Sequence, residues 1–229
     1  MSDYVSEIAQ LVSVWALPVL IAVTLHEAAH GWAASRLGDP TARLMGRVTL
    51  NPFAHVDLMG TIVIPLGLVL MQAPFLFGYA KPVPVNINRL NKPRRDMALV
   101  AAAGPASNIL IAFIAALLFH VVSSAPDVAK EWLAINLANM IRLNVILAVF
   151  NLLPIPPLDG GRILVSVLPD YLAFKLAKLE RTGIVIVVGA LFLLPYLAGK
   201  VLIDIPIVEV LLLEPVKWLA KLVLMAAGH

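Results

Sequence analysis

Thr24-Leu25-His26-Glu27-Ala28-Ala29-His30 sets the architecture expected for this chain of 229 residues. Two histidines four positions apart on a helix lie about 40° from eclipsed, so both imidazoles can reach one metal ion from the same face. Glu27 lies one position further round and can act on a metal-bound water without being a ligand, as in the H-E-x-x-H pattern. His26 and His30 are therefore candidate metal ligands, and Glu27 is a candidate catalytic base.

The surroundings of this motif are apolar. From Ile8 to Ser35 the chain has no Lys, Arg or Asp, and its only charged residue is Glu27. A helix of that length spans a bilayer, so the motif is expected at lipid depth, where ionisable groups are costly to bury and usually functional. The same residues could instead form a polar contact between helices of a bundle, or the metal site of a transporter.

Composition indicates an all-α polytopic membrane protein with a single domain over residues 1–229. Hydrophobic residues make up 61% of the chain and charged residues 14%, which is too little polar surface to cover a soluble globule. The chain has no cysteine, so a metal must be held by His, Asp or Glu. No basic region precedes the first apolar run, so we expect that run to remain as a helix rather than be cleaved as a signal peptide.

Apolar runs predict a helical bundle of five to six transmembrane segments. The clearest runs cover about residues 8–34, 97–122, 132–153, 183–197 and 201–225. Residues 42–50 lie between chain breakers and show a loose alternation with β-branched residues. This pattern predicts a small membrane-associated β-hairpin. Residues 58–78 are apolar but interrupted by Pro65, Gly67 and Pro74, so this segment either spans the membrane or re-enters and leaves on the same side.

Basic residues predict the orientation. If residues 58–78 re-enter, the loops 35–57, 79–96 and 159–182 share one side and carry 12 Lys and Arg, against Lys130 and Lys200 on the other. The positive-inside rule then places those loops in the cytosol, with the N-terminus outside and, after five crossings, the C-terminus in the cytosol. The histidines would lie roughly 9 to 15 Å below the cytosolic surface.

A third ligand is needed, because catalytic zinc takes three protein ligands and a water. The candidate lies in Asn151-Leu-Leu-Pro-Ile-Pro-Pro-Leu-Asp159-Gly-Gly161. Its prolines stop the preceding helix, and its glycines let the backbone turn closely, so Asp159 is expected on an extended segment at the depth of His30. The alternative is that Asp159-Gly160 is a plain turn.

Three motifs in this order resemble the site-2 protease family of intramembrane zinc metalloproteases: HEAAH at the end of a span, AGPASN at residues 103–108, and NLLPIPPLDGG at residues 151–161. Residues 44–61 and 77–86 look like the compact bacterial and archaeal members, which lack a PDZ or cystathionine-synthase-like domain. The likeness covers about residues 20–168 and leaves the C-terminal helices at 183–225 outside it.

The resemblance implies one Zn²⁺ per chain, bound by His26, His30 and Asp159, with Glu27 as the general base. It suggests Asn151 as a polar group near the oxyanion or the substrate backbone. Asn108 looks like a residue that supports a ligand or packs the core.

The implied function is that of a zinc metalloendopeptidase in the cell membrane. Water on the zinc, activated by Glu27, would attack a peptide bond within or near a transmembrane helix of a membrane-protein substrate, on the cytosolic side. The partners expected are that substrate and the lipid bilayer; nucleic acid is not expected, and the oligomeric state stays open. The alternatives are a metal-ion transporter, which would carry ionisable residues along several spans, and a catalytically inactive binder.

Several further polar residues allow two roles each. His55 is either a ligand or auxiliary active-site group, or a structural histidine that hydrogen-bonds within its loop. Asn136, Asn139 and Arg142 share one helical stripe, which either lines a path for substrate or water or bonds to a neighbouring helix. Gly104 is expected to permit close helix packing.

Overall fold

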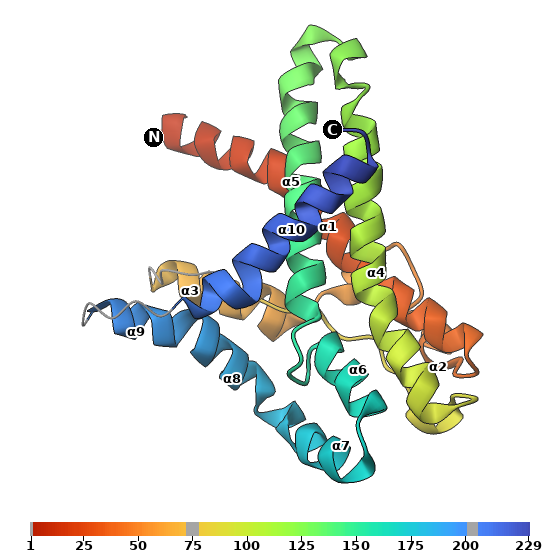
Figure 1. Cartoon of the computed structure of the whole chain (residues 1–229). Coiled ribbons are helices and arrows are strands. Elements are labelled where there is room, and N and C mark those ends of the chain that lie inside the picture. The colour runs from red at the N-terminus through yellow and green to blue at the C-terminus, as the bar shows by residue number, and fades with distance from the viewer. Residues whose placement is uncertain (1, 72–77, 201–205) are drawn as a thin grey trace.

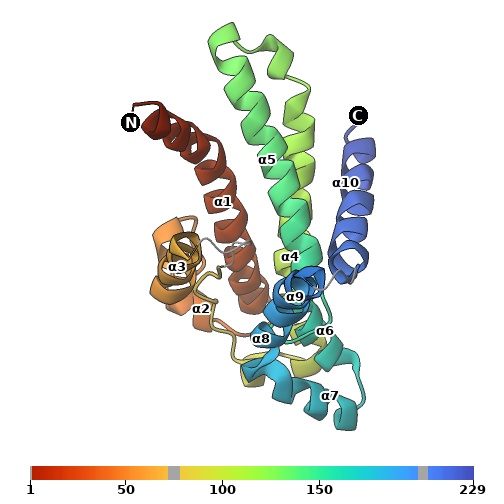
Figure 2. The ribbon, with the colours of Figure 1, turned by 90° about the vertical axis from the view of Figure 1, so that its left-hand side faces the viewer.

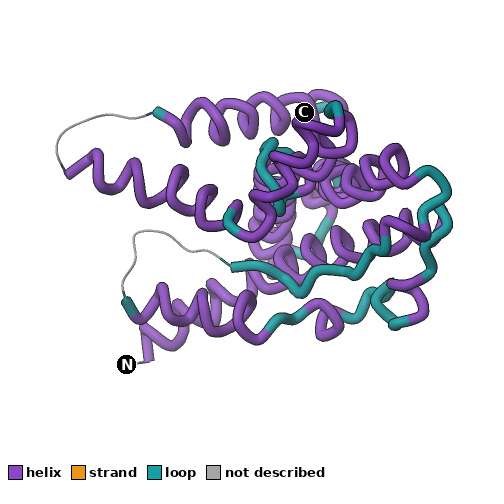
Figure 3. Tube along the Cα trace, turned by 90° about the horizontal axis from the view of Figure 1, so that it is seen from below, coloured by secondary structure: helices purple, strands orange, loops and turns teal. Residues whose placement is uncertain are grey.

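The computed structural model describes residues 2–71, 78–200 and 206–229, and this part of the chain is helical without any β-strand (Figure 3). Its α-helices are α1 (Ser2–Arg36), α2 (Thr41–Leu44), α3 (Ile64–Leu70), α4 (Pro93–Phe119), α5 (Asp127–Asn151), α6 (Asp159–Val167), α7 (Asp170–Ala177), α8 (Gly183–Val188), α9 (Leu194–Lys200) and α10 (Glu214–Ala226). Wider π-helical turns precede α3, α9 and α10 at Leu58–Val63, Gly189–Leu193 and Glu209–Leu213.

Three of these helices are long and apolar enough to cross a membrane, which identifies a membrane protein. They cover Ala9–Arg36 in α1, Pro93–Phe119 in α4 and Asp127–Asn151 in α5. Two shorter apolar helices cover Leu58–Leu68 and Gly183–Leu197. Three of the predicted spans are therefore present as long helices, and the total of five to six stays a prediction.

Helix α4 occupies the middle of the bundle. It packs against α1, α5, α6 and α10, as the two perpendicular views show (Figures 1 and 2). Ala112 and Ala116 on α4 are fully buried against Ile141 and Val145 of α5. Small side chains at such a contact let helix backbones approach, which is the main source of helix association in lipid.

The predicted β-hairpin at residues 42–50 is wrong. Residues 41–44 form α2, and residues after the left-handed turn at Gly46 form bends. Ala42 is fully buried, and its Cβ would lie only 3.2 Å from a Cβ added to Gly31 of α1. Burial of Ala42 against α1 therefore outweighs the loose alternation, which is a weak strand signal at this length.

The two ends of the segment 58–78 lie next to each other. Its described helical part, Leu58–Leu70, is about 20 Å long, shorter than the roughly 30 Å hydrocarbon core. The Tyr79 N–H donates to the Gly60 carbonyl at 3.0 Å, and the Thr61 hydroxyl donates to the Tyr79 carbonyl at 3.0 Å. The two ends therefore share a depth, as re-entry requires; the predicted breaker Pro74 lies outside the described residues.

The C-terminal end differs from expectation. His120 Nε2 donates to the Ala227 carbonyl at 2.7 Å, and His229 Nε2 donates to the Ala116 carbonyl at 2.9 Å. The chain therefore ends beside the end of α4 that is remote from the loop 79–96 (Figure 1), not on the side of that loop. The expectation counted residues 183–197 as a full crossing, but this helix is shorter than the three long ones.

Candidate metal centre

Three donor atoms from α1 and α6 converge on one point. His26 Nε2 and His30 Nε2 lie 3.1 Å apart, and Asp159 Oδ2 lies 3.2 Å from the first and 3.3 Å from the second. All three residues are buried, and among the described residues they form a group of His and Asp that can hold a metal ion. Spacing on α1 supplies the two imidazoles, and the fold brings Asp159 to them.

The size of this triangle suits zinc. Zinc bonds to nitrogen and oxygen are about 2.0 to 2.2 Å long, and neighbouring ligands of a tetrahedral ion with such bonds are therefore about 3.3 Å apart. The three observed separations, 3.1 to 3.3 Å, are close to that value. A zinc ion held by these three atoms would have a position left for water or substrate.

The orientation of the two rings also favours a cation. His26 Nδ1 lies 2.6 Å from the Asn108 side-chain oxygen, and His30 Nδ1 lies 2.7 Å from the Val100 carbonyl. Because both partners only accept, each Nδ1 donates its hydrogen to them, and the Nε2 of each ring faces inward. Asp159 Oδ2 is buried and has no hydrogen-bond partner. Two imidazole nitrogens and a carboxylate oxygen that face one another at this distance fit a metal ion.

Asn108 is part of a buried amide relay. Its Nδ2 donates to the Asn144 side-chain oxygen at 2.7 Å and to the Ala22 carbonyl at 3.3 Å, which turns its own oxygen toward His26. Asn108 and Asn144 are both fully buried. The sequence indicated a supporting or packing role for Asn108 but not its hydrogen bond to Asn144. The available signal for that bond was the presence of two amide side chains in apolar spans.

Gly104 makes room for the site. A Cβ on this residue of α4 would lie 2.4 Å from His30 Nε2 and 2.6 Å from His26 Cε1. Real Cβ atoms do not approach other atoms so closely. The predicted close packing at Gly104 is confirmed, and its consequence is more specific than expected, because the helix packs directly on the two imidazoles.

The carboxylate is presented by a tightly folded turn. Leu158 is extended, as predicted, but Asp159 itself is the first residue of α6 rather than part of a plain turn. A Cβ on Gly160 would lie 2.1 Å from the Leu152 carbonyl oxygen, and one on Gly161 would lie 2.1 Å from the Pro156 nitrogen. These two glycines are therefore required for the start of α6 to lie against residues 152–156.

Glu27, Asn151 and His55 each bond to a backbone group outside the metal centre. Glu27 is half-buried on α1, and its Oε2 accepts a hydrogen bond from the Val83 N–H at 2.8 Å. The Asn151 amide donates to the Leu147 carbonyl at 3.0 Å, one turn back on its own helix. His55 is buried in its loop, where Nε2 donates to the Thr49 carbonyl at 3.2 Å, which confirms its structural role.

The stripe on α5 makes contacts within the bundle. The Asn139 amide donates to the Val14 carbonyl of α1 at 3.1 Å, and Asn136 bonds to the Trp132 carbonyl on its own helix. Arg142 is exposed. Asn139 therefore supports the predicted bonding to a neighbouring helix.

Comparisons with known proteins agree with this chemistry. The chain matches the family described as Peptidase family M50 over residues 14–130 and 121–196. It belongs to the M50, or site-2 protease, family. It is therefore a zinc metalloprotease of the membrane.

Several relatives of this M50 peptidase carry names of the same kind. It is 40% identical over 160 residues to the "Putative zinc metalloprotease YwhC" of Bacillus subtilis (strain 168), covering 67% of this chain and 68% of that protein. It is 30% identical over 158 residues to the "Putative zinc metalloprotease Rip2" of Mycolicibacterium smegmatis, covering 69% of this chain and 57% of that protein. Rip2 of Mycobacterium tuberculosis (strain H37Rv) is 30% identical over 141 residues, with 62% and 52% covered. No solved structure matches.

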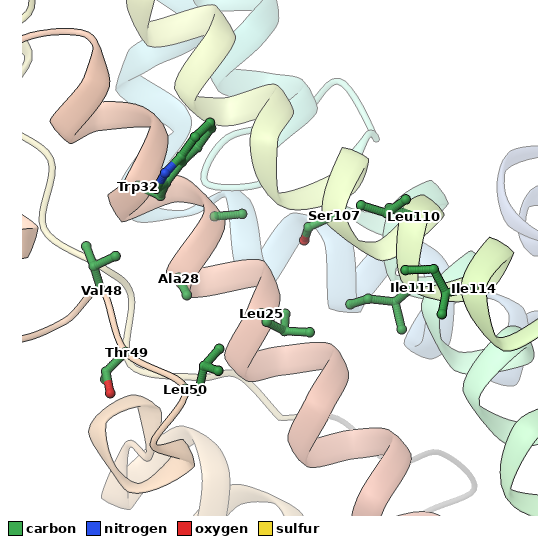
Figure 4. Close-up of a pocket in the computed structure, with 11 residues that line it drawn as sticks. Leu25, Ala28, Trp32, Val48, Thr49, Leu50, Ser107, Leu110, Ile111 and Ile114 are labelled. Carbon is green, nitrogen blue, oxygen red and sulfur yellow. The ribbon is translucent and has the colours of Figure 1, made fainter.

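The M50 peptidase also has an apolar groove of about 510 Å³ between α1, α4 and residues 48–50 (Figure 4). Its floor on α1 is formed by Leu25, Ala28, Ala29 and Trp32, and its sides by residues 48–50 and by α4 from Ser107 to Ile114. At 100° per residue the floor points about 150° away from Glu27 around α1. The groove therefore lies over a face of α1 that points away from Glu27.

Proposed function

We propose that this protein is an intramembrane zinc metalloendopeptidase that cuts peptide bonds within or near transmembrane helices of membrane-protein substrates. The observation that carries the proposal is the convergence of His26 Nε2, His30 Nε2 and Asp159 Oδ2 within 3.3 Å, on and beside a helix long enough to span the bilayer. We assign these three residues as the ligands of one zinc ion. When bound, zinc lowers the pKa of a coordinated water and polarises a peptide carbonyl.

Glu27 is the general base in this proposal. It follows His26 directly, and its Oε2 is occupied by the Val83 N–H, which leaves Oε1 to accept a proton from water. The same carboxyl group can then deliver that proton to the nitrogen of the departing amine, since one group serves as base and then as acid. Glu27 needs no zinc contact for either step.

Asn151 is proposed as a donor to the oxyanion that develops on the substrate carbonyl. Its amide now bonds to the Leu147 carbonyl. A rotation about its side-chain torsions would exchange that bond for the substrate oxygen. A donor of this kind typically contributes about 3 kcal/mol to transition-state stabilisation.

The substrate must reach this site unwound, because a helix satisfies its own peptide groups with hydrogen bonds. A strand edge at residues 43–51, which could have held an extended chain, is absent since those residues form α2 and bends. The backbone near Glu27 that lies outside helices is instead the segment 81–86. We place the site toward the cytosol, because the loops 35–57, 79–96 and 159–182 carry 12 basic residues.

The competing proposal, a metal-ion transporter, predicts several ionisable clusters along a path. Within the described residues the structure offers one group of three His, Asp or Glu side chains close enough to share an ion. A single buried centre suits hydrolysis better than conduction.

The test is cleavage of a transmembrane peptide by the purified protein in detergent, with Glu27→Gln as the variant and Glu131→Gln as the control. Glu131 is exposed on α5, so the control makes the same chemical change away from the site. We expect Glu27→Gln to lose about 10²- to 10⁴-fold in rate while it keeps its zinc, and Glu131→Gln to cut normally. Undiminished cleavage by Glu27→Gln, or zinc flux through it into liposomes, would refute the proposal.

A further inference from the structure

A segment without helix or strand lies along α1 beside the Glu27 carboxylate. We call residues 81–86, Lys-Pro-Val-Pro-Val-Asn, the strap. The Val83 N–H donates to Glu27 Oε2 at 2.8 Å, and the Asn86 N–H donates to Asp39 Oδ2 at 2.6 Å. The strap therefore connects Glu27 in the membrane-spanning part of α1 to Asp39, just beyond the end of that helix.

The sequence of the strap gives Val83 a special position. Pro82 and Pro84 have no N–H, so Val83 supplies the one backbone donor of these three residues, and Glu27 receives it. The Val83 side chain is buried, and a Cβ on Gly31 would lie 3.2 Å from its Cγ1. Val83 thus packs on α1 one turn after Glu27, and the absence of a side chain at Gly31 permits this approach.

Groups other than Glu27 hold both ends of the strap. At one end the buried Arg47 guanidinium donates to the Lys81 carbonyl at 2.7 Å, and the Lys81 N–H donates to the His55 carbonyl at 2.9 Å. At the other end the fully buried Asp39 carboxylate accepts from Asn86. Because these contacts fix the strap independently, the strap holds the Glu27 carboxylate rather than the reverse.

The charge of Asp39 makes it a strong anchor. Burial acts to raise the pKa of its carboxyl group, but hydrogen bonds from the Thr41 hydroxyl and from the Asn86 and Thr41 amides, together with the positive charge of Arg89, lower that pKa below its usual value. Asp39 is therefore ionised at neutral pH. Hydrogen bonds from amides to a carboxylate are shorter and stronger than those to a neutral oxygen.

We propose that the strap positions the general base: the Val83 N–H fixes Glu27 Oε2 and so directs Oε1 toward the substrate water, with Arg47 and Asp39 as remote positioning residues. The inference rests on the proposed role of Glu27. A glutamate side chain on its own rotates about three bonds, and a misplacement of about 1 Å in a reacting group typically costs about 10²-fold in rate. Val83, Arg47 and Asp39 do not touch the reacting atoms.

The first experiment compares Val83→Pro with Val83→Ala in cleavage of a transmembrane peptide. Proline removes the N–H, whereas alanine keeps it and removes only side-chain contacts. We expect Val83→Pro to lower kcat by about 10- to 100-fold with KM and zinc content unchanged, and Val83→Ala to stay within a few fold of the parent protein. Full kcat in zinc-loaded Val83→Pro would overturn the proposal.

A second measurement does not need activity and covers the case that Val83→Pro fails to fold. Hydrogen exchange of the peptide containing Val83 is compared in the parent protein, Glu27→Gln and Glu27→Ala. The glutamine oxygen can still accept from the amide, so we expect protection in the first two proteins and faster exchange in Glu27→Ala. Equal exchange in all three would show that Val83 and Glu27 are not bonded and would overturn the proposal.

The remote contacts provide a rescue test. Arg47→Met removes the donor to the Lys81 carbonyl, whereas Arg47→Lys retains a donor. We expect kcat to fall about tenfold in Arg47→Met at constant KM and to recover in Arg47→Lys. Equal kcat in Arg47→Met and the parent protein would contradict the remote role. If Glu27→Gln is inactive while zinc-loaded Val83→Pro cuts at full rate, the strap proposal fails and the proposed function stands; if Glu27→Gln cuts, the function itself fails.

Discussion

Asp159 Oδ2 lies 3.2 Å from His26 Nε2, although the two residues belong to different helices at distant points of the sequence. The contact joins the first turn of α6 to the first residue of the HEAAH motif on α1. His26 Nδ1 bonds to Asn108, so Nε2 is the ring nitrogen that faces the carboxylate. A metal ion is what makes such an arrangement favourable.

Gly104→Ala is expected to displace the ligands. Its new Cβ would lie 2.4 Å from His30 Nε2, so either α4 or the imidazole must shift. Because zinc tolerates changes of only about 0.2 Å in bond length, we expect zinc content of the purified protein to fall well below one per chain. Gly67→Ala is the matched control, as a Cβ there meets nothing within 4 Å. Normal zinc content in Gly104→Ala would contradict the described packing.

Asn108→Ala is expected to weaken zinc binding by about 10- to 100-fold in a chelator competition assay. The substitution removes the oxygen that holds the His26 Nδ1 hydrogen and leaves that group buried without an acceptor. Ser107→Ala is the control, because the Ser107 hydroxyl bonds to the Gly104 carbonyl on its own helix. Equal zinc affinities for the two variants would exclude a supporting role for Asn108.

Asn144→Ala is expected to act on zinc through Asn108. Loss of the Asn144 oxygen releases the Asn108 amide and so loosens the acceptor of His26. In a double-mutant cycle we expect the losses of zinc affinity caused by Asn144→Ala and Asn108→Ala to be clearly less than additive, as for residues in one network. Strict additivity would show that the two amides act independently.

Cysteine labelling tests the re-entrant segment, since the chain has no native cysteine and therefore no background. Phe53→Cys and Asn88→Cys flank the segment at exposed positions, and Lys130→Cys lies in the first turn of α5, next to the α4–α5 connection. With a membrane-impermeant maleimide we expect positions 53 and 88 to react from the cytosolic side and position 130 from the other. Labelling of 53 and 88 from opposite sides would show that residues 58–78 cross the membrane.

The metal centre was accessible from sequence because its chemistry depends on local patterns. The spacing of His26 and His30 places both on one face of a helix, and the proline and glycine pattern around Asp159 indicates a carboxylate held by a turn. Gly104 was expected to allow close packing, but only coordinates show that it packs on the imidazoles.

Other features left no comparable signal. The Val83 N–H is a backbone group that every residue except proline offers, so its bond to Glu27 could not be inferred. The hairpin prediction at residues 42–50 failed because burial of Ala42 against α1, a tertiary contact, outweighs a local alternation. The expectation that the C-terminus lies on the side of the loop 79–96 failed because hydropathy does not tell a short apolar helix from a crossing.

The most direct test of the zinc centre is the zinc K-edge X-ray absorption spectrum of the inactive Glu27→Gln protein, recorded beside that of Glu27→Gln with Asp159→Ala. We predict one zinc per chain with two imidazole nitrogens and oxygen ligands at about 2.0 to 2.2 Å, and loss of the carboxylate oxygen or of the zinc itself when Asp159 is replaced. An identical spectrum at full zinc content in both proteins would show that Asp159 is not a ligand and would contradict the proposed centre.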